Sequence, residues 1–214
     1  MQPPSNKRWI IADRISEKAD QSLAMYPPIV RQILVNRGIE DAVQALRYME
    51  GRSVLNDPFL MKDMAAAVDR ISYAIDKHER MAVYGDFDAD GVTATVLLIE
   101  VLRSFDAQVE PYIPNRFDEG YGLNTEALEH LAASGVQLVI TVDCGIRSIR
   151  EAERARQLGV NLIITDHHHP LQEIPDAESV ICPKQEGDNY PEKNLAGVGV
   201  AYKLAQALFA RRTG

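Results

Sequence analysis

Apolar residues recur at helical spacing through the first third of the chain. Residues 27–50 and 62–78 place them three or four positions apart, with proline, glycine and the sequence NDP as punctuation. This spacing predicts helices. We therefore expect residues 1–80 to form a helical amino-terminal region.

From residue 81 the pattern changes to short runs rich in β-branched and aromatic residues. Four of these runs are predicted strands: MAVYG, VEPYI, QLVITV and NLIIT. Helical stretches between and after them begin near Ala89, Asn124, Arg147 and Gly197. Strands that alternate with helices are typical of an α/β domain with a parallel sheet, which we expect over residues 81–214.

Acidic side chains follow three of the four predicted strands. Asp86 comes directly after MAVYG, with Asp88 and Asp90 close behind it. Asp143 follows QLVITV, and Asp166 follows NLIIT. Because the carboxyl ends of parallel strands share one edge, where open α/β sheets bind ligands, these five carboxylates are expected to converge.

Three consecutive histidines, residues 167–169, bring imidazole groups to the same edge. So many carboxylates would repel one another strongly unless divalent cations lie among them or several are protonated. Mixed Asp and His ligands without cysteine disfavour structural zinc, and imidazole disfavours calcium, which leaves Mn²⁺, Mg²⁺ and Fe²⁺, with Mn²⁺ the best match. The number of ligands predicts a two-metal centre that generates hydroxide and stabilises the oxygens of a phosphoryl group.

Other interpretations of these motifs stay open. DFDADG begins like an EF-hand loop, but Leu97 stands where the bidentate glutamate should be. A strand followed by DADG also suits an aspartyl-phosphatase-like phosphomonoesterase, with Asp88 as nucleophile and Asp90 as acid, although the histidines then have no role. Acidic residues at loop ends are often only helix caps. His169, which precedes Pro170, is expected to be a surface residue.

The composition, 46% hydrophobic with a net charge of −8, is that of an ordinary soluble globular protein. Residues 81–214 hold 20 of the 31 acidic residues and 11 of the 23 basic ones, so a nucleic-acid partner would need local basic patches and bound cations. The two cysteines form no CxxC pair and fit a reducing compartment. No apolar run approaches a membrane span and the start lacks a signal-peptide core, so we expect a cytoplasmic protein without a membrane partner.

The motifs GDFDADG, TVDCGI and TDHH follow successive predicted strands and together resemble the DHH phosphoesterase superfamily. The segments IPNRFDEGYGL and LAGVGVAYKLAQAL point to its RecJ branch, the single-stranded-DNA-specific exonucleases. The resemblance covers residues 27–212. It implies a cytoplasmic enzyme that degrades single-stranded DNA from the 5′ end to mononucleotides, uses two Mn²⁺ or Mg²⁺ ions, and acts in DNA repair and recombination, with a single-strand-binding protein or a helicase as candidate partner.

The resemblance also implies which residues hold the metals. They are the aspartates of the first two motifs and the first histidine of the third: Asp86, Asp88, Asp90, Asp143 and His167. Asp143 would be the bridging ligand. Asp86 stands near a position where related proteins use a histidine.

Two catalytic roles and a substrate-binding loop follow from the same resemblance. His168 would contact the scissile phosphate or assist the leaving oxygen, and Asp166 would orient the histidines. Arg116 would clamp a phosphate, and Phe117 and Tyr121 would offer stacking faces to bases.

Family members continue past the matched stretch into a further motif with another aspartate ligand, a second domain and DNA-binding appendages. This chain stops at ARRTG. We therefore expect it to be the amino-terminal part of a longer enzyme and, by itself, a weak nuclease. A non-catalytic DNA-binding or scaffolding module is the alternative.

Overall fold

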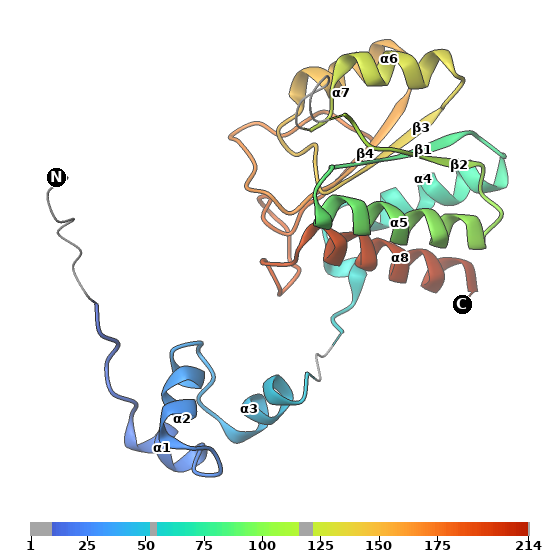
Figure 1. Cartoon of the computed structure of the whole chain (residues 1–214). Helices are drawn as coiled ribbons and strands as arrows, with labels where there is room; N and C mark the ends of the chain where they lie inside the picture. The colour runs from blue at the N-terminus through green and yellow to red at the C-terminus, as the bar shows by residue number, and fades with distance from the viewer. Residues whose placement is uncertain (1–9, 52–54, 116–121, 214) are drawn as a thin grey trace, which may run out of the picture. The chain divides into compact units, whose positions relative to one another are not determined.

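The computed structural model describes residues 10–51, 55–115 and 122–213 (Figure 1). The chain divides into two compact units, Met1–Leu55 and Asn56–Gly214. Within the described residues, no helix is both long and apolar enough to cross a lipid bilayer.

The amino-terminal unit is helical, as the sequence predicted. Its helices are α1 (Glu17–Ser22), α2 (Pro28–Val35) and α3 (Ala42–Met49). The chain turns between α2 and α3, where Gly38 adopts a φ of 77° and Asp41 caps α3 by accepting hydrogen bonds from two backbone N–H groups. A small core of Leu23, Leu34 and Ala45 holds these helices together.

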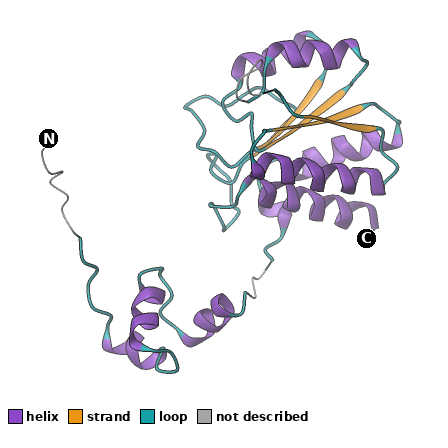
Figure 2. Cartoon of the chain, viewed as in Figure 1, coloured by secondary structure: helices purple, strands orange, loops and turns teal. Residues whose placement is uncertain are grey.

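The second unit is an α/β domain. Its helical elements are η1 (Pro58–Leu60), α4 (Met64–Asp76), α5 (Ala89–Ser104), α6 (Thr125–Ala133), α7 (Ile149–Gln157) and α8 (Gly197–Thr213). Its strands are β1 (Met81–Gly85), β2 (Val109–Tyr112), β3 (Leu138–Val142), β4 (Asn161–Thr165) and β5 (Ser179–Ile181). All pairings between neighbouring strands are parallel, so the predicted fold class is confirmed (Figure 2).

Helices cover both faces of the sheet (Figure 1). Alternate strand residues point to opposite faces. Met81 and Val83 of β1 join the core formed with α4, α5 and α8, whereas Ala82 and Tyr84 join the core formed with α6 and α7. Because β1, β3 and β4 are almost completely buried, they appear in the sequence as nearly continuous apolar runs, whereas the edge strand β2 is only partly buried.

The order of the strands is β2-β1-β3-β4-β5. After β1 the chain passes through α5 to β2 at the edge, and it then returns through α6 to β3 on the other side of β1. The order therefore reverses between β1 and β3. In open parallel sheets, ligands bind at the carboxyl ends of the strands that flank such a switch point.

Helix α4 belongs to the unit that contains the sheet. Its side chains Met64, Val68 and Ile71 are fully buried in the core shared with α5 and α8. The compact unit therefore starts at Asn56, earlier than residue 81, where the change of sequence pattern placed the start of the α/β domain.

We expect a chain of residues 56–214 to fold cooperatively and a chain of residues 81–214 to fail. Removing α4 exposes several buried apolar side chains, each worth about 1.5–3 kcal/mol, and this loss is comparable to the whole stability of a domain, about 5–15 kcal/mol. Thermal unfolding followed by circular dichroism checks this. If residues 81–214 unfolded cooperatively at the same temperature as residues 56–214, the assignment of α4 to this core would be wrong.

Candidate metal centre

The loop after β1 carries two carboxylates, Asp86 and Asp88, which accept hydrogen bonds from different backbone groups. Asp86 is 1% exposed, and its Oδ1 accepts a hydrogen bond from the N–H of Phe87 at 2.7 Å. Asp88 is the N-cap of α5, and its Oδ1 accepts from the N–H groups of Asp90 at 2.8 Å and Gly91 at 3.0 Å. Gly91 lets the first turn of α5 lie against Asp86, since a Cβ at position 91 would be 2.6 Å from the Cβ of Asp86. The tight turn therefore needs both the cap and the glycine.

Asp143 follows β3 in an unusual backbone conformation. Its φ is 61°, in the left-handed region that aspartate tolerates better than most residues. The side chain is 2% exposed, and its Oδ1 is buried without a hydrogen-bond partner among the described residues. A strained backbone and an unsatisfied buried carboxylate oxygen both point to a functional site.

The loop after β4 is organised around Asp166. Its Oδ1 accepts hydrogen bonds from the N–H of His167 at 2.7 Å, the N–H of His168 at 3.0 Å and Nδ1 of His168 at 2.7 Å. Its Oδ2 accepts from the N–H of Ile146, in the loop after β3, at 2.9 Å. Because a carboxylate can only accept from Nδ1, a proton of His168 is placed there.

The ring of His167 is held by a backbone carbonyl. Its Nδ1 lies 3.0 Å from the carbonyl oxygen of Leu195, which can only accept, so Nδ1 carries the proton. Nε2 then faces Oδ1 of Asp143 at 3.1 Å and Oδ2 of Asp90 at 3.7 Å. A nitrogen lone pair and carboxylate oxygens at these distances repel one another unless a cation or a second proton lies among them. Metal-ligating histidines commonly donate their other N–H to a backbone carbonyl in this way.

Two groups of side chains can each surround a cation. In one group, ligand atoms of Asp86, Asp88 and Asp143 lie within 4.8 Å of one another; in the other, those of Asp143, His167 and His168 do. Asp143 belongs to both groups. Its unsatisfied oxygen and the oxygen and nitrogen donors around it fit hard or borderline divalent cations such as Mg²⁺ or Mn²⁺.

Asp90 has another partner in the structure. Its Oδ2 accepts a hydrogen bond from the N–H of Gly197 and its Oδ1 accepts one from the N–H of Val198, both at 2.7 Å. Both oxygens are thus directed at the start of α8, a contact that sequence reasoning missed. The glycines of AGVG were the one signal in the sequence for a close approach there. A ligand role for Asp90 stays a prediction.

His169 is exposed, as the sequence predicted, and is not part of the cluster. His169 accepts a hydrogen bond through its carbonyl oxygen from Nε of Arg147 at 2.8 Å. The proposed substrate residues Arg116, Phe117 and Tyr121 lie outside the described residues.

Burial and neighbouring charge perturb the acids of this cluster. Burial, reinforced by the negative charges of Asp90 and Asp88, raises the pKa of Asp143 to about 7. Burial also raises the pKa of Asp86. A cation that binds Asp143 below neutral pH therefore has to displace a proton.

Neither cysteine is poised for chemistry. Burial raises the pKa of Cys144 well above its usual value and that of Cys182 to about 11. Both thiols are free and buried, so they act as small core residues rather than as nucleophiles or ligands.

A hollow of about 360 Å³ opens beside the histidine loop. Asp166 and His168 line it together with Leu123, Ile146 and Arg147. It brings the imidazole of His168 and the guanidinium of Arg147 to one space of the size of a small ligand.

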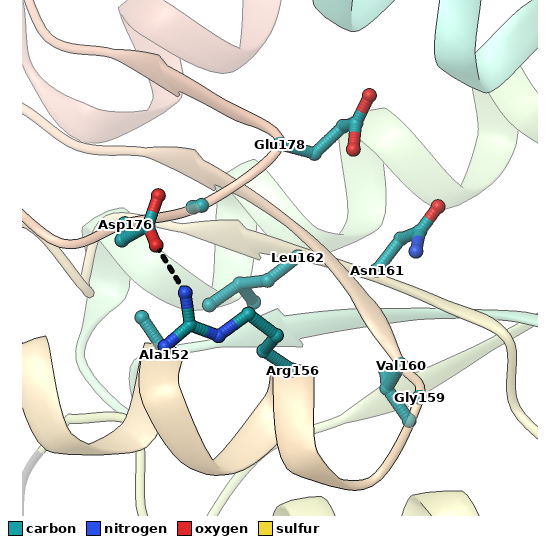
Figure 3. A pocket seen from close by; sticks show the side chains of 9 residues that line it. Ala152, Arg156, Gly159, Val160, Asn161, Leu162, Asp176 and Glu178 are labelled. Atoms are coloured by element: carbon teal, nitrogen blue, oxygen red, sulfur yellow. Dashed lines mark hydrogen bonds and ion pairs between the residues drawn. The ribbon is translucent and has the colours of Figure 1, made fainter.

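A second hollow, of about 250 Å³, lies where β4 begins and thus away from the acidic cluster (Figure 3). An ion pair of 2.7 Å between Arg156 and Asp176 crosses it, and both side chains are largely exposed. Exposed ion pairs of this kind contribute little to stability. None of the described residues that line this hollow has a buried polar atom without a hydrogen-bond partner, so nothing here indicates a ligand.

Comparisons with known proteins agree on one family. The model of the DHH family, N-terminal domain, matches residues 80–213. The single-stranded-DNA-specific exonuclease RecJ of Bacillus subtilis (strain 168) is 45% identical over 209 residues, and that of Escherichia coli (strain K12) is 40% identical over 195. These matches cover 95% and 91% of this chain but 26% and 33% of the relatives, so the chain spans about a third of their length or less.

Solved structures give the same result. A crystal structure of exonuclease RecJ bound to manganese has a TM-score of 0.65 and 39% identity, and covers 71% of this chain and 38% of its own. The structure of RecJ from Thermus thermophilus in complex with Mn²⁺ has a TM-score of 0.72 and 29% identity, over 91% of this chain and 26% of that one.

The raised pKa of Asp143 generates a prediction about stability. Its folded pKa, about 7, exceeds the usual 3.8, so the folded state holds a proton that the unfolded state releases between these values. In metal-free protein, the stability contributed by this group falls as the pH rises from about 4 to about 7. We expect Asp143→Asn to increase the free energy of unfolding at pH 8, by up to about 4 kcal/mol, and to change it little at pH 4.

Urea unfolding in EDTA at both pH values measures this effect. Asp176→Asn, at an exposed position, is the matched control and should change stability by no more than about 1 kcal/mol. Equal effects of Asp143→Asn at pH 4 and pH 8 would show that Asp143 is not protonated in the folded protein.

Proposed function

We propose, because the chain belongs to the DHH family, that it carries the metal-binding catalytic core of an exonuclease that hydrolyses single-stranded DNA from the 5′ end to mononucleotides. The observation that carries this proposal is the convergence of Asp86, Asp143 and the loop around Asp166 at the switch point of the sheet. The names of the relatives, single-stranded-DNA-specific exonucleases, support the substrate class. DNA repair and recombination is the corresponding process.

Two Mn²⁺ or Mg²⁺ ions are the proposed cofactors, since solved relatives were crystallised with either metal. When bound, two such ions activate water and stabilise the charge that develops on a phosphoryl group. The residues proposed to hold them are Asp86, Asp88, Asp90, Asp143 and His167. Asp143 is the proposed shared ligand because it lies in both candidate groups.

The histidine loop is proposed to act on the phosphate. Asp166 holds the Nδ1–H of His168, and the ring is proposed to contact the scissile phosphate or to assist the leaving oxygen by donating a proton from Nε2. The carboxylate also prevents rotation of the imidazole ring. Asp166 is thus a positioning residue, and His168 is the proposed catalytic one.

The terminal nucleotide is proposed to enter the hollow beside His168. This domain is acidic overall, so a DNA phosphate needs local positive charge there. Arg147 lines the hollow, and its Nε is fixed to the carbonyl of His169. The motif residues Arg116, Phe117 and Tyr121 are proposed to add a phosphate clamp and stacking faces.

Degradation of end-labelled oligonucleotides tests the function. With Mn²⁺ and enzyme in excess, we expect slow release of mononucleotides from the 5′ end of a single strand and none from a blunt duplex. Asp143→Ala should abolish the release and so exclude a contaminating nuclease. If labelled product is absent although Mn²⁺ binds, the chain is a non-catalytic module and the proposal is wrong.

A single turnover of ³²P-labelled substrate, stopped rapidly with acid, separates direct hydrolysis by water from a phosphoenzyme route. We expect all of the label in the released product and none on the protein. Hydroxylamine-labile ³²P on the protein that Asp88→Asn abolishes would support the aspartyl-phosphatase alternative instead.

A substitution of Arg147 tests the placement of the substrate. Arg147→Ala removes a charge-assisted contact worth about 1.5–3 kcal/mol, so the oligonucleotide concentration for half-maximal single-turnover rate should rise about tenfold or more. The maximal rate should change less than about twofold, since the contact is expected equally in ground and transition states. Arg150→Ala, three residues along and also exposed, is the matched control. If both variants behave like the original protein, the DNA does not pass through this hollow.

A further inference from the structure

The segment 195–198, where α8 begins, contacts three residues of the candidate metal centre. The carbonyl of Leu195 accepts from Nδ1 of His167 at 3.0 Å. The N–H groups of Gly197 and Val198 donate to Asp90 at 2.7 Å each. The backbone of Gly197 lies against Asp143, so closely that a Cβ at position 197 would be 2.5 Å from Cγ of Asp143.

We propose that Gly197 is a positioning residue that fixes the spacing of Asp143, His167 and Asp90 for the cations. The proposal rests on the proposed function, because it assumes that these residues hold metal. It assigns a role to the glycine-rich start of α8, which contributes no side chain of its own to the centre. A residue with any side chain at position 197 would displace Asp143, the ligand proposed to be shared.

The same segment orients two of the polar side chains of the centre. Two N–H groups at the start of a 17-residue helix stabilise the Asp90 carboxylate, and the positive end of the helix dipole adds to this. The Leu195 carbonyl places the proton of His167 on Nδ1, which directs the Nε2 lone pair at Asp143. A shift of the segment therefore moves three ligating groups together.

Gly199 offers the matched control within the same helix. A Cβ at position 199 would be 3.3 Å from Cβ of Leu195, a contact that a small adjustment of that side chain relieves. Its three nearest atoms would all belong to the side chain of Leu195 and none to the three metal-centre residues. Gly199→Ala therefore introduces the same methyl group into the same turn without crowding Asp143.

Calorimetric titration with Mn²⁺ tests the proposal. Gly197→Ala should weaken Mn²⁺ binding by about 10–100-fold, as the loss of other positioning contacts does, whereas Gly199→Ala should stay within about twofold of the original protein. Circular dichroism in EDTA establishes that each variant is folded. The ¹⁵N shifts of the His167 ring give a readout that a general loss of stability would not change: the preference for the Nδ1–H form should weaken in Gly197→Ala alone.

Val198→Pro provides a second variant in case Gly197→Ala does not fold. In the original protein the N–H of Val198 donates to Asp90 and makes no helical hydrogen bond. The helical hydrogen bonds of α8 begin with the one from the N–H of Val200 to the carbonyl of Ala196. Proline at position 198 therefore removes the donor without breaking a helical bond. We expect weaker Mn²⁺ binding here too. If the original protein binds no Mn²⁺, the proposed function is wrong; if it binds Mn²⁺ and both variants bind equally well, only this inference is wrong.

Discussion

Repulsion among carboxylates at one edge of the sheet is the constraint on which the rest of the site depends. Two like charges roughly 4 Å apart repel by about 4 kcal/mol at an effective dielectric constant of about 20, which is more than the roughly 1 kcal/mol that a helix cap contributes. The protein offsets this repulsion with backbone N–H groups. Asp88 receives them from α5, Asp90 from α8, and Asp166 from the loops after β3 and β4. Asp143 alone among these four has an oxygen that is both buried and unsatisfied, and burial, reinforced by the charges of Asp90 and Asp88, raises its pKa to about 7.

The order of the strands explains why the charge gathers there. Because β2 lies on one side of β1 and β3 on the other, the chain leaves the carboxyl ends of β1 and β3 in opposite directions and opens a crevice between them. Asp86 and Asp143 occupy these two strand ends, and β4 brings the histidine loop next to them. The acidic residues thus need no dedicated scaffold, since each follows a buried strand that the hydrophobic core already fixes.

Local sequence accounts for most of the fold. The four predicted strands and the helices after them are present because β-branched runs and helical spacing are strong local signals over five or more residues. Strand β5 was missed because SVI is only three residues long and depends on pairing with β4. The unit to which α4 belongs could not be predicted either. Its apolar face predicts a helix that packs against something, but not whether the partner is another amino-terminal helix or the sheet.

In the site, too, the features that local sequence determines could be predicted, and the contacts between residues distant in sequence could not. Strand ends and motif spacing predicted the convergence of Asp86, Asp88, Asp143 and the histidines, because β1, β3 and β4 end at the same edge of the sheet. The partners of Asp90 could not be predicted, since 107 positions separate it from Gly197. Glycine in the first turn of a helix is unfavourable by local propensity, so its presence indicates a tertiary requirement, but only the structure identifies the requirement as the side chain of Asp143. The candidate metal centre, assembled from the ends of separate strands, is therefore also contacted by a segment distant in sequence: the carbonyl of Leu195 accepts from His167, and the N–H groups of Gly197 and Val198 donate to Asp90.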